Sequence, residues 1–83
     1  MKREECLHLP GVPNAAPRAT RCEHCGAEHS LRVCATCAYV GCCESQAGHD
    51  RDHWKATGHP IIRSLPLTDR SFVWCYDCNE YLF

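Results

Sequence analysis

Three C-x-x-C pairs constrain this chain more than any other feature of its sequence. They are Cys22 with Cys25, Cys34 with Cys37, and Cys75 with Cys78. Two cysteines at this spacing share a tight turn, so both thiolates can reach one metal ion, and the spacing is typical of zinc sites. Because structural zinc takes four ligands, each pair is half of a site. Three closed sites therefore need three further pairs of ligands.

Six more cysteines and histidines lie at ligand spacing. They are Cys6, His8, Cys42, His49, His53 and His59. Cys6 and His8 fall on one face of an extended segment, and we expect them to join the last C-x-x-C pair and so tie the two ends of the chain together. Twelve ligands divide into three tetrahedral sites, so we expect three zinc ions, or two if the site that joins the ends is empty.

The two histidines at positions 49 and 53 are one helical turn apart. They could bind the same ion, or they could point to separate ions above and below, and the spacing leaves both arrangements open. Three candidate ligands are left over. We expect His24 and His29 on the surface of the turns, and we expect Cys43 to be a small, partly buried residue.

The length of the chain makes metal sites important for its stability. Its 83 residues are expected to form a single domain, 1–83. In chains of about 70–80 residues or fewer, a hydrophobic core rarely supplies more than about 3–5 kcal/mol. A structural zinc in a small finger contributes an apparent ~10–16 kcal/mol near neutral pH. The fold is therefore expected to depend on its zinc ions.

Disulfides do not explain the cysteines as well as zinc does. The nine cysteines are an odd number, and histidines recur among them at ligand spacing. The N-terminal residues MKREECLHLPGVP lack the apolar stretch of a secretory signal. No run approaches the ~20 apolar residues of a membrane span. We expect a soluble, cytoplasmic, monomeric protein with no membrane partner.

The remaining patterns predict a small α+β domain with short antiparallel strands. The segment from about 48 to 57 suits the one main helix, because Asp50 and Asp52 come early, Lys55 comes late and Gly58 ends it. Strands are expected in SLRV, AYVGC, IIRSLPL and SFVWCYDCNEYLF, which are rich in β-branched and aromatic residues.

The ligands follow one another in the order C-x-H, C-x-x-C, C-x-x-C, C, H, H, H, C-x-x-C. This order, over essentially the whole chain, resembles the UBP-type zinc finger of ubiquitin-specific proteases and of a cytoplasmic histone deacetylase. The resemblance implies that fold and three interleaved sites. The sets it implies are Cys22, Cys25, Cys42 and His49; Cys34, Cys37, His53 and His59; and Cys6, His8, Cys75 and Cys78. On this resemblance, the two histidines of the helix serve different ions.

The resemblance also implies a site for a partner. Family members that bind ubiquitin capture its free C-terminal Gly-Gly tail in a slot with aromatic walls and an arginine, which pairs with the carboxylate. Trp74, Tyr76 and Tyr81 match the aromatic positions of that slot. We therefore expect these three residues to contact the tail of a protein or peptide.

The opposite wall of the slot differs from that of ubiquitin binders. Where they carry Gly-Arg-aromatic after the cysteine that matches Cys42, this chain has Cys43, Glu44 and Ser45. Glu44 reverses the charge that the slot offers to a carboxylate. Arg32 stands where binders often have Trp, and it could supply the missing cation from another side of the slot. We expect an interaction module with a degraded diglycine pocket that binds free ubiquitin weakly or not at all. A working receptor for the ubiquitin tail is the alternative.

Other functions fit less well. HDRDH resembles the H-E-x-x-H motif of metallohydrolases, but zinc with four protein ligands has no open position for water. Nine Lys and Arg against ten Asp and Glu, with no basic stripe, argue against binding to nucleic acid. A thiol-based redox or metal sensor that uses Cys43 is a second alternative. Since the chain carries no protease or deacetylase domain, we expect a freestanding, non-enzymatic finger of the kind found in bacteria.

Overall fold

The computed structural model describes residues 1–83. It contains a short 3-10 helix, η1 (Arg3–Glu5), one α-helix, α1 (His49–Thr57), and five strands. The strands are β1 (Leu31–Cys34), β2 (Val40–Cys42), β3 (Ile61–Ser64), β4 (Val73–Cys75) and β5 (Glu80–Leu82). The α+β class, the single main helix and the strand segments are confirmed. The last predicted segment is divided into β4 and β5, because the third C-x-x-C pair forms the turn between them.

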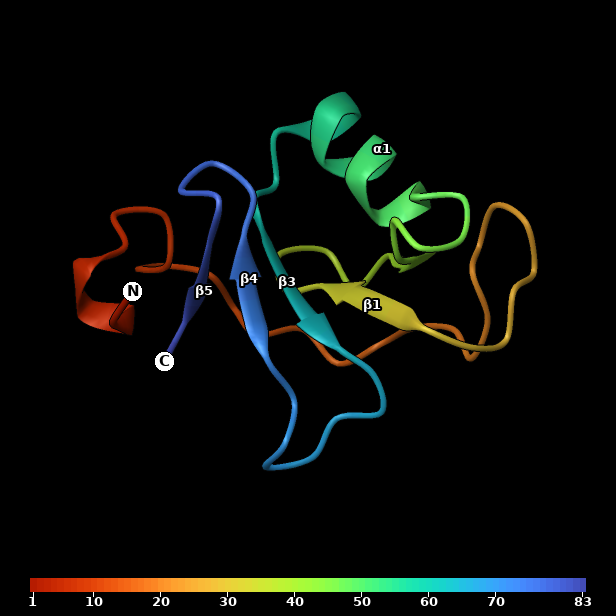
Figure 1. The fold of residues 1–83 in the computed structure, drawn as a ribbon, viewed down its shortest axis with the longest axis horizontal. Coiled ribbons are helices and arrows are strands. Elements are labelled where there is room, and N and C mark those ends of the chain that lie inside the picture. Colours follow the sequence, from red (N-terminus) through yellow and green to blue (C-terminus); the bar gives the residue numbers. More distant parts are fainter.

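The five strands form one antiparallel sheet in the order β2-β1-β3-β4-β5. Figure 1 shows α1 at one side of the sheet and the two ends of the chain close together beside β5. The first residues extend the sheet at that edge, since the Arg3 amide donates to the Phe83 carbonyl at 3.0 Å and the Phe83 amide donates to the Met1 carbonyl at 2.9 Å. The predicted meeting of the two ends is therefore present in the backbone.

The helix begins and ends where its sequence predicts. Gly58 follows it in the left-handed conformation, at a φ of 76°, and its amide donates to the Trp54 carbonyl at 2.7 Å. At the other end, the start of α1 lies against β2 at Gly41. A Cβ at Gly41 would lie 2.6 Å from the backbone nitrogen of Asp50, so only glycine allows this approach.

The hydrophobic core is thin and includes metal ligands. Only 16 of 83 residues are buried, which is too few for burial alone to stabilise the fold. One cluster joins Cys6 and Cys75 to Ala35, Ile61, Val73 and Leu82. The other joins Cys22 and Cys42 to Leu31, Val33 and Val40. Each core cluster is thus continuous with a group of candidate zinc ligands.

Candidate functional site

Twelve cysteines and histidines meet in three groups of four. Within each group the ligand atoms all lie within 4.8 Å of one another. The groups are Cys22, Cys25, Cys42 and His49; Cys34, Cys37, His53 and His59; and Cys6, His8, Cys75 and Cys78. We call them the first, second and third centres. They are the sets that the resemblance in the sequence implies.

The first centre joins the turn before β1 to the end of β2 and the start of α1. The Nδ1 atom of His49 lies 3.4 Å from the Cys22 sulfur and 3.3 Å from the Cys42 sulfur. The second centre joins the turn after β1 to the helix and the residues that follow it. Its His53 Nε2 atom lies 3.3 Å from the Cys37 sulfur. The two histidines of α1 thus face different centres.

The third centre ties the N-terminal segment to the turn between β4 and β5. The Nδ1 atom of His8 lies 3.5 Å from the Cys75 sulfur and 3.3 Å from the Cys78 sulfur. The other ring nitrogen of His8 lies 3.8 Å from a carboxylate oxygen of Asp77. A carboxylate beside the outer nitrogen helps to orient a ligating histidine.

These distances suit zinc. With Zn–S bonds of about 2.3 Å and Zn–N bonds of about 2.0–2.1 Å, the edges of a tetrahedral site measure about 3.5–3.8 Å. The shorter S···S and S···N distances within the groups run from 3.3 to 4.0 Å, and none of the ligand atoms of a group lies more than 4.8 Å from another. Each group offers four Cys or His ligands and so matches a closed structural site. The chain therefore carries three clusters suited to zinc.

The electrostatics of the clusters also favour a cation. Burial opposes ionisation of Cys22, but the backbone amides of Cys25 and His24 donate to its sulfur and lower its pKa to about 6. Burial raises the pKa of Cys75 to about 12. Some ligands are thus ready to ionise near neutral pH, while others lose their proton only when a metal arrives. Burial lowers the pKa of His53, which keeps the ring in the neutral form that binds metal.

Each C-x-x-C turn ends in a left-handed residue. Gly26, Ala38 and Asn79 directly follow the second cysteine of the three pairs, with φ values of 75°, 72° and 56°. In the first two turns the amide of this residue donates back to the carbonyl of the first cysteine at 2.9 Å. The same backbone turn therefore holds three different residue types, and only glycine adopts it without strain.

The three leftover residues lie outside the clusters. His24 is exposed and its ring packs on that of His49, with centroids 4.1 Å apart. His29 is exposed in the turn before β1. Cys43 is 9% exposed, and its sulfur lies 2.6 Å from the Ser45 hydroxyl. Burial opposes ionisation of Cys43, but this hydrogen bond and the charge of Arg32 lower its pKa overall.

All five residues expected to contact a partner line one groove of about 310 Å³. They are Arg32, Glu44, Trp74, Tyr76 and Tyr81. The register explains part of this grouping, since Trp74 is paired with Tyr81 across β4 and β5, and paired residues share a face of the sheet. The Trp74 and Tyr81 rings meet edge to face at 4.8 Å. We call this hollow the aromatic groove.

The charges in the aromatic groove are mixed. The guanidinium carbon of Arg32 lies 4.7 Å from the centre of the Phe72 ring. Glu44 is exposed, and its carboxylate lies 3.8 Å from Arg51. Asp50 is only 4% exposed and accepts a hydrogen bond of 2.9 Å from the Tyr76 hydroxyl. Burial raises the pKa of Asp50, and this hydrogen bond opposes the rise.

Sequence reasoning missed several residues of the groove. Ile62, Phe72 and Asp50 also line it, together with Cys43 and Ser45, which the sequence had placed on the opposite wall. Phe72 could have been found, because it lies two positions before Trp74 and therefore points to the same side. Asp50 gave no such signal. It looks like an exposed residue in the first turn of the helix, and it is buried because α1 packs against β2.

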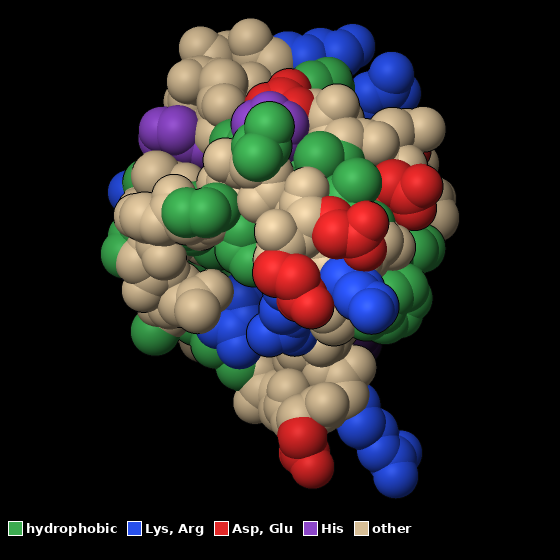
Figure 2. Space-filling view, turned by 90° about the vertical axis from the view of Figure 1, so that its left-hand side faces the viewer, with side chains coloured by type: hydrophobic (Ala, Val, Ile, Leu, Met, Phe, Trp, Pro, Cys, Tyr) green, Lys and Arg blue, Asp and Glu red, His purple; other side chains and the backbone are tan.

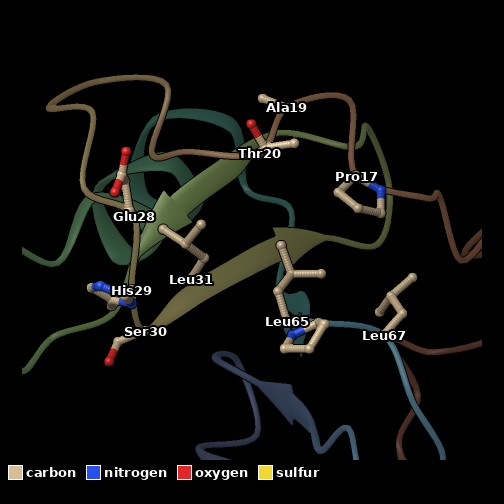
Figure 3. Close-up of a pocket in the computed structure, with 10 residues that line it drawn as sticks. Pro17, Ala19, Thr20, Glu28, His29, Ser30, Leu31, Leu65 and Leu67 are labelled. Carbon is tan, nitrogen blue, oxygen red and sulfur yellow. The ribbon is translucent and has the colours of Figure 1, made fainter.

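A second hollow, of about 450 Å³, is lined by none of the twelve candidate ligands (Figure 3). Leu31 of β1 lies there with Leu65 and Leu67 of the loop after β3, and Pro17 and Ala19 lie on the opposite wall. None of the five residues expected to contact a partner lines it. No helix of the structure has the length and apolar character needed to cross a membrane.

Comparison with known proteins shows the family of the chain. A family described as a zinc finger in ubiquitin hydrolases and other proteins matches residues 22–83. The NAD-dependent deacetylase sir2A of Dictyostelium discoideum is 33% identical over an alignment of 87 positions, which covers 94% of this chain and 16% of that protein. Ubiquitin carboxyl-terminal hydrolase 14 of Schizosaccharomyces pombe is 27% identical over an alignment of 89 positions, which covers 90% of this chain and 12% of that protein.

A solved structure is also similar. The solution NMR structure of a protein from Rhodopseudomonas palustris superposes with a TM-score of 0.78 at 37% identity, and the match covers 92% of this chain and 78% of that one. The sir2A deacetylase and hydrolase 14 are far longer, and this chain spans less than a fifth of either. On these matches, the chain belongs to the UBP-type family of zinc fingers found in ubiquitin hydrolases and other proteins.

Proposed function

We propose that this chain is a non-enzymatic interaction module that takes up the tail of a protein or peptide in the aromatic groove. One observation carries the proposal: Arg32, Trp74 and Tyr81 come from three different strands, and they line the same hollow as Glu44 and Tyr76. Trp74, Tyr76 and Tyr81 supply aromatic surface to this hollow, and Trp and Tyr are enriched where proteins contact their partners.

The metal clusters support a structural role for zinc. Each cluster supplies four protein ligands, whereas catalytic zinc keeps one position for water or substrate. Zinc in these clusters would hold the walls of the groove, since Tyr76 directly follows the ligand Cys75 and Cys43 directly follows the ligand Cys42. Thiolate ligands suit a reducing compartment such as the cytoplasm, where thiols stay reduced.

The charges of the groove argue against tight binding of a free carboxylate. Glu44 and Asp50 both line it, against the single cation Arg32. Loss of one charge-assisted hydrogen bond costs about 1.5–3 kcal/mol, and a facing carboxylate adds repulsion. A total of about 3–4 kcal/mol weakens binding by a hundredfold to a thousandfold, because each 1.4 kcal/mol is about tenfold. The proposed module therefore does not bind free ubiquitin tightly.

One observation favours the alternative of a working ubiquitin-tail receptor. Arg32 lies inside the groove, over Phe72, and it forms no ion pair. Its guanidinium could therefore donate hydrogen bonds to a carboxylate in the groove. Two of the related proteins are named as ubiquitin carboxyl-terminal hydrolases, which makes ubiquitin the first ligand to test.

A titration separates the two proposals. The zinc-loaded protein is titrated with ubiquitin and with ubiquitin that lacks its last two glycines, and binding is followed by calorimetry. We expect weak binding or none. Micromolar affinity that requires the two glycines and is lost in Arg32→Ala would establish the alternative. If wild-type binding is absent, Glu44→Arg with Cys43→Gly should partly restore it.

Binding of other tails is tested with a library of peptides that have free and amidated C-termini. Peptides that bind should lose affinity for Trp74→Ala, which removes a wall of the groove. Phe83→Ala is the matched control, because Phe83 is an aromatic residue that is 80% exposed and does not line the groove. Equal loss in both variants would refute the groove as the binding site.

A further inference from the structure

An arginine projects from the face of the sheet opposite the aromatic groove. Arg63 lies on β3, the central strand, and is paired with Val33 of β1 and Val73 of β4. Its neighbour Ile62 lines the aromatic groove, so Arg63 points the other way. Val33 and Val73 are only 0% and 6% exposed. The half-buried Arg63 side chain therefore leaves the sheet between two core residues, and it makes no hydrogen bond or ion pair within the structure.

Arg63 opens into a hollow of about 380 Å³. Its walls come from three parts of the chain: η1 with the segment that follows it, β3 and β4, and the loop between those strands. They include Arg3, Asn14, Arg63, Thr68, Asp69 and Ser71. Figure 2 views the molecule from the side of η1 and β5 and shows Lys and Arg side chains gathered just above the loop that protrudes at the bottom. We call this hollow the arginine hollow.

The hollow has more free donors than acceptors. Arg3, like Arg63, forms no ion pair, and Asp69 is the single carboxylate among the lining residues. Two hydroxyls brace the loop, since the Thr68 amide donates to the Ser71 oxygen at 2.8 Å and the Arg70 amide donates to the Thr68 hydroxyl oxygen at 3.1 Å. The Thr68 hydroxyl proton remains free to donate.

We infer that the arginine hollow binds a phosphate group, held between the guanidinium groups of Arg3 and Arg63. The planar fork of arginine matches the oxygens of a phosphate, and hydrogen bonds to it are charge-assisted. Thr68 and Asn14 supply neutral donors at the wall. A bound anion neutralises the cation that emerges from the apolar face of the sheet. This site is independent of the aromatic groove, because the two lie on opposite faces of β3.

The test uses the zinc-loaded, isotopically labelled full chain at low chloride, titrated with inorganic phosphate and observed by NMR. Saturable shifts are expected at the amides of Arg63, Thr68 and Ser71. Arg63→Gln and Arg3→Gln should each weaken binding by about tenfold or more, and Arg63→Lys should weaken it less than Arg63→Gln, because lysine keeps the charge and loses the fork. An unchanged zinc content shows that each variant is folded.

Arg70→Gln is the matched control, because it removes one positive charge from the loop between β3 and β4, which forms part of the wall, at an exposed residue that does not line the hollow. It should change the affinity by less than about twofold. Equal loss in this control, or the absence of saturable shifts, would overturn the proposal. A short phosphoserine peptide, compared with its unphosphorylated form, shows the source: tighter binding than inorganic phosphate indicates a phosphorylated partner, and equal binding indicates the free anion.

Discussion

The Tyr76 hydroxyl donates a hydrogen bond of 2.9 Å to the carboxylate of Asp50. The two residues are far apart in the sequence, but each directly follows a candidate zinc ligand, Cys75 for Tyr76 and His49 for Asp50. The Tyr76 ring also stacks on Trp54 of the helix, with centroids 4.9 Å apart. This bond therefore connects the first and third centres through the floor of the aromatic groove.

Removal of this bond should cost stability. Tyr76→Phe leaves the Asp50 carboxylate buried without its side-chain donor, which should lower the free energy of unfolding by about 1–3 kcal/mol. Urea unfolding of the zinc-loaded protein measures the change. Tyr81→Phe is the control, because Tyr81 is 46% exposed and its effect should be near zero. Equal stability of Tyr76→Phe and wild type would show that the bond contributes nothing.

A methyl group at Gly41 should push the helix away from the sheet. The added Cβ would lie 2.6 Å and 2.9 Å from backbone atoms of Asp50, so the strand or the helix must shift, at a cost of about 1–3 kcal/mol or more. Because His49 begins the helix, Gly41→Ala should loosen the first centre. Alkylation with mass spectrometry should show faster labelling of Cys25, while the remote Cys78 stays protected. Equal labelling of both would mean that the whole fold is lost.

Two substitutions in the C-x-x-C turns should change the stability of the protein in opposite directions. Ala38 and Gly26 hold the same left-handed position, at φ values of 72° and 75°. Ala38→Gly should stabilise the protein by up to about 1 kcal/mol, because glycine avoids the strain of this conformation. Gly26→Ala should destabilise it by about 1 kcal/mol, since a Cβ there meets no other atom and adds only the strain. Thermal melts of the zinc-loaded variants should shift in opposite directions; a shift in the same direction would contradict the account.

The two histidines of the helix should each control one zinc ion. Native mass spectrometry should count three zinc ions in the wild type and two in His49→Ala or His53→Ala, since the first faces the sulfur of Cys22 and the second that of Cys37. Alkylation should expose Cys25 in His49→Ala and Cys37 in His53→Ala. The same exposed cysteines in both variants would mean that the histidines share an ion. In the wild type, Cys43 should be the single cysteine that zinc does not protect from labelling, because it belongs to none of the three clusters.

Much of the framework could be predicted from local sequence. The C-x-x-C turns and the helix from His49 to Thr57 depend on residues close to one another in the chain, and Gly58 ends the helix through its own backbone freedom. The spacing of His49 and His53 left open whether they share an ion, and the resemblance in the order of ligands implied that they do not. In the structure the two histidines lie in different clusters, because successive turns of α1 face different ends of β1 and β2.

The sequence by itself determined the twelve candidate ligands, the turns that present half of them and the one helix, because spacing along the chain settles these features. Tertiary structure alone decided the rest. Asp50 is buried because Gly41, which has no side chain, lets the start of α1 pack closely against β2. The groove residues meet because β4 pairs with both β3 and β5. Arg63 emerges among valines because β3 is central in the sheet. These features depend on contacts between distant segments, and no local pattern in the sequence records which segments will pair.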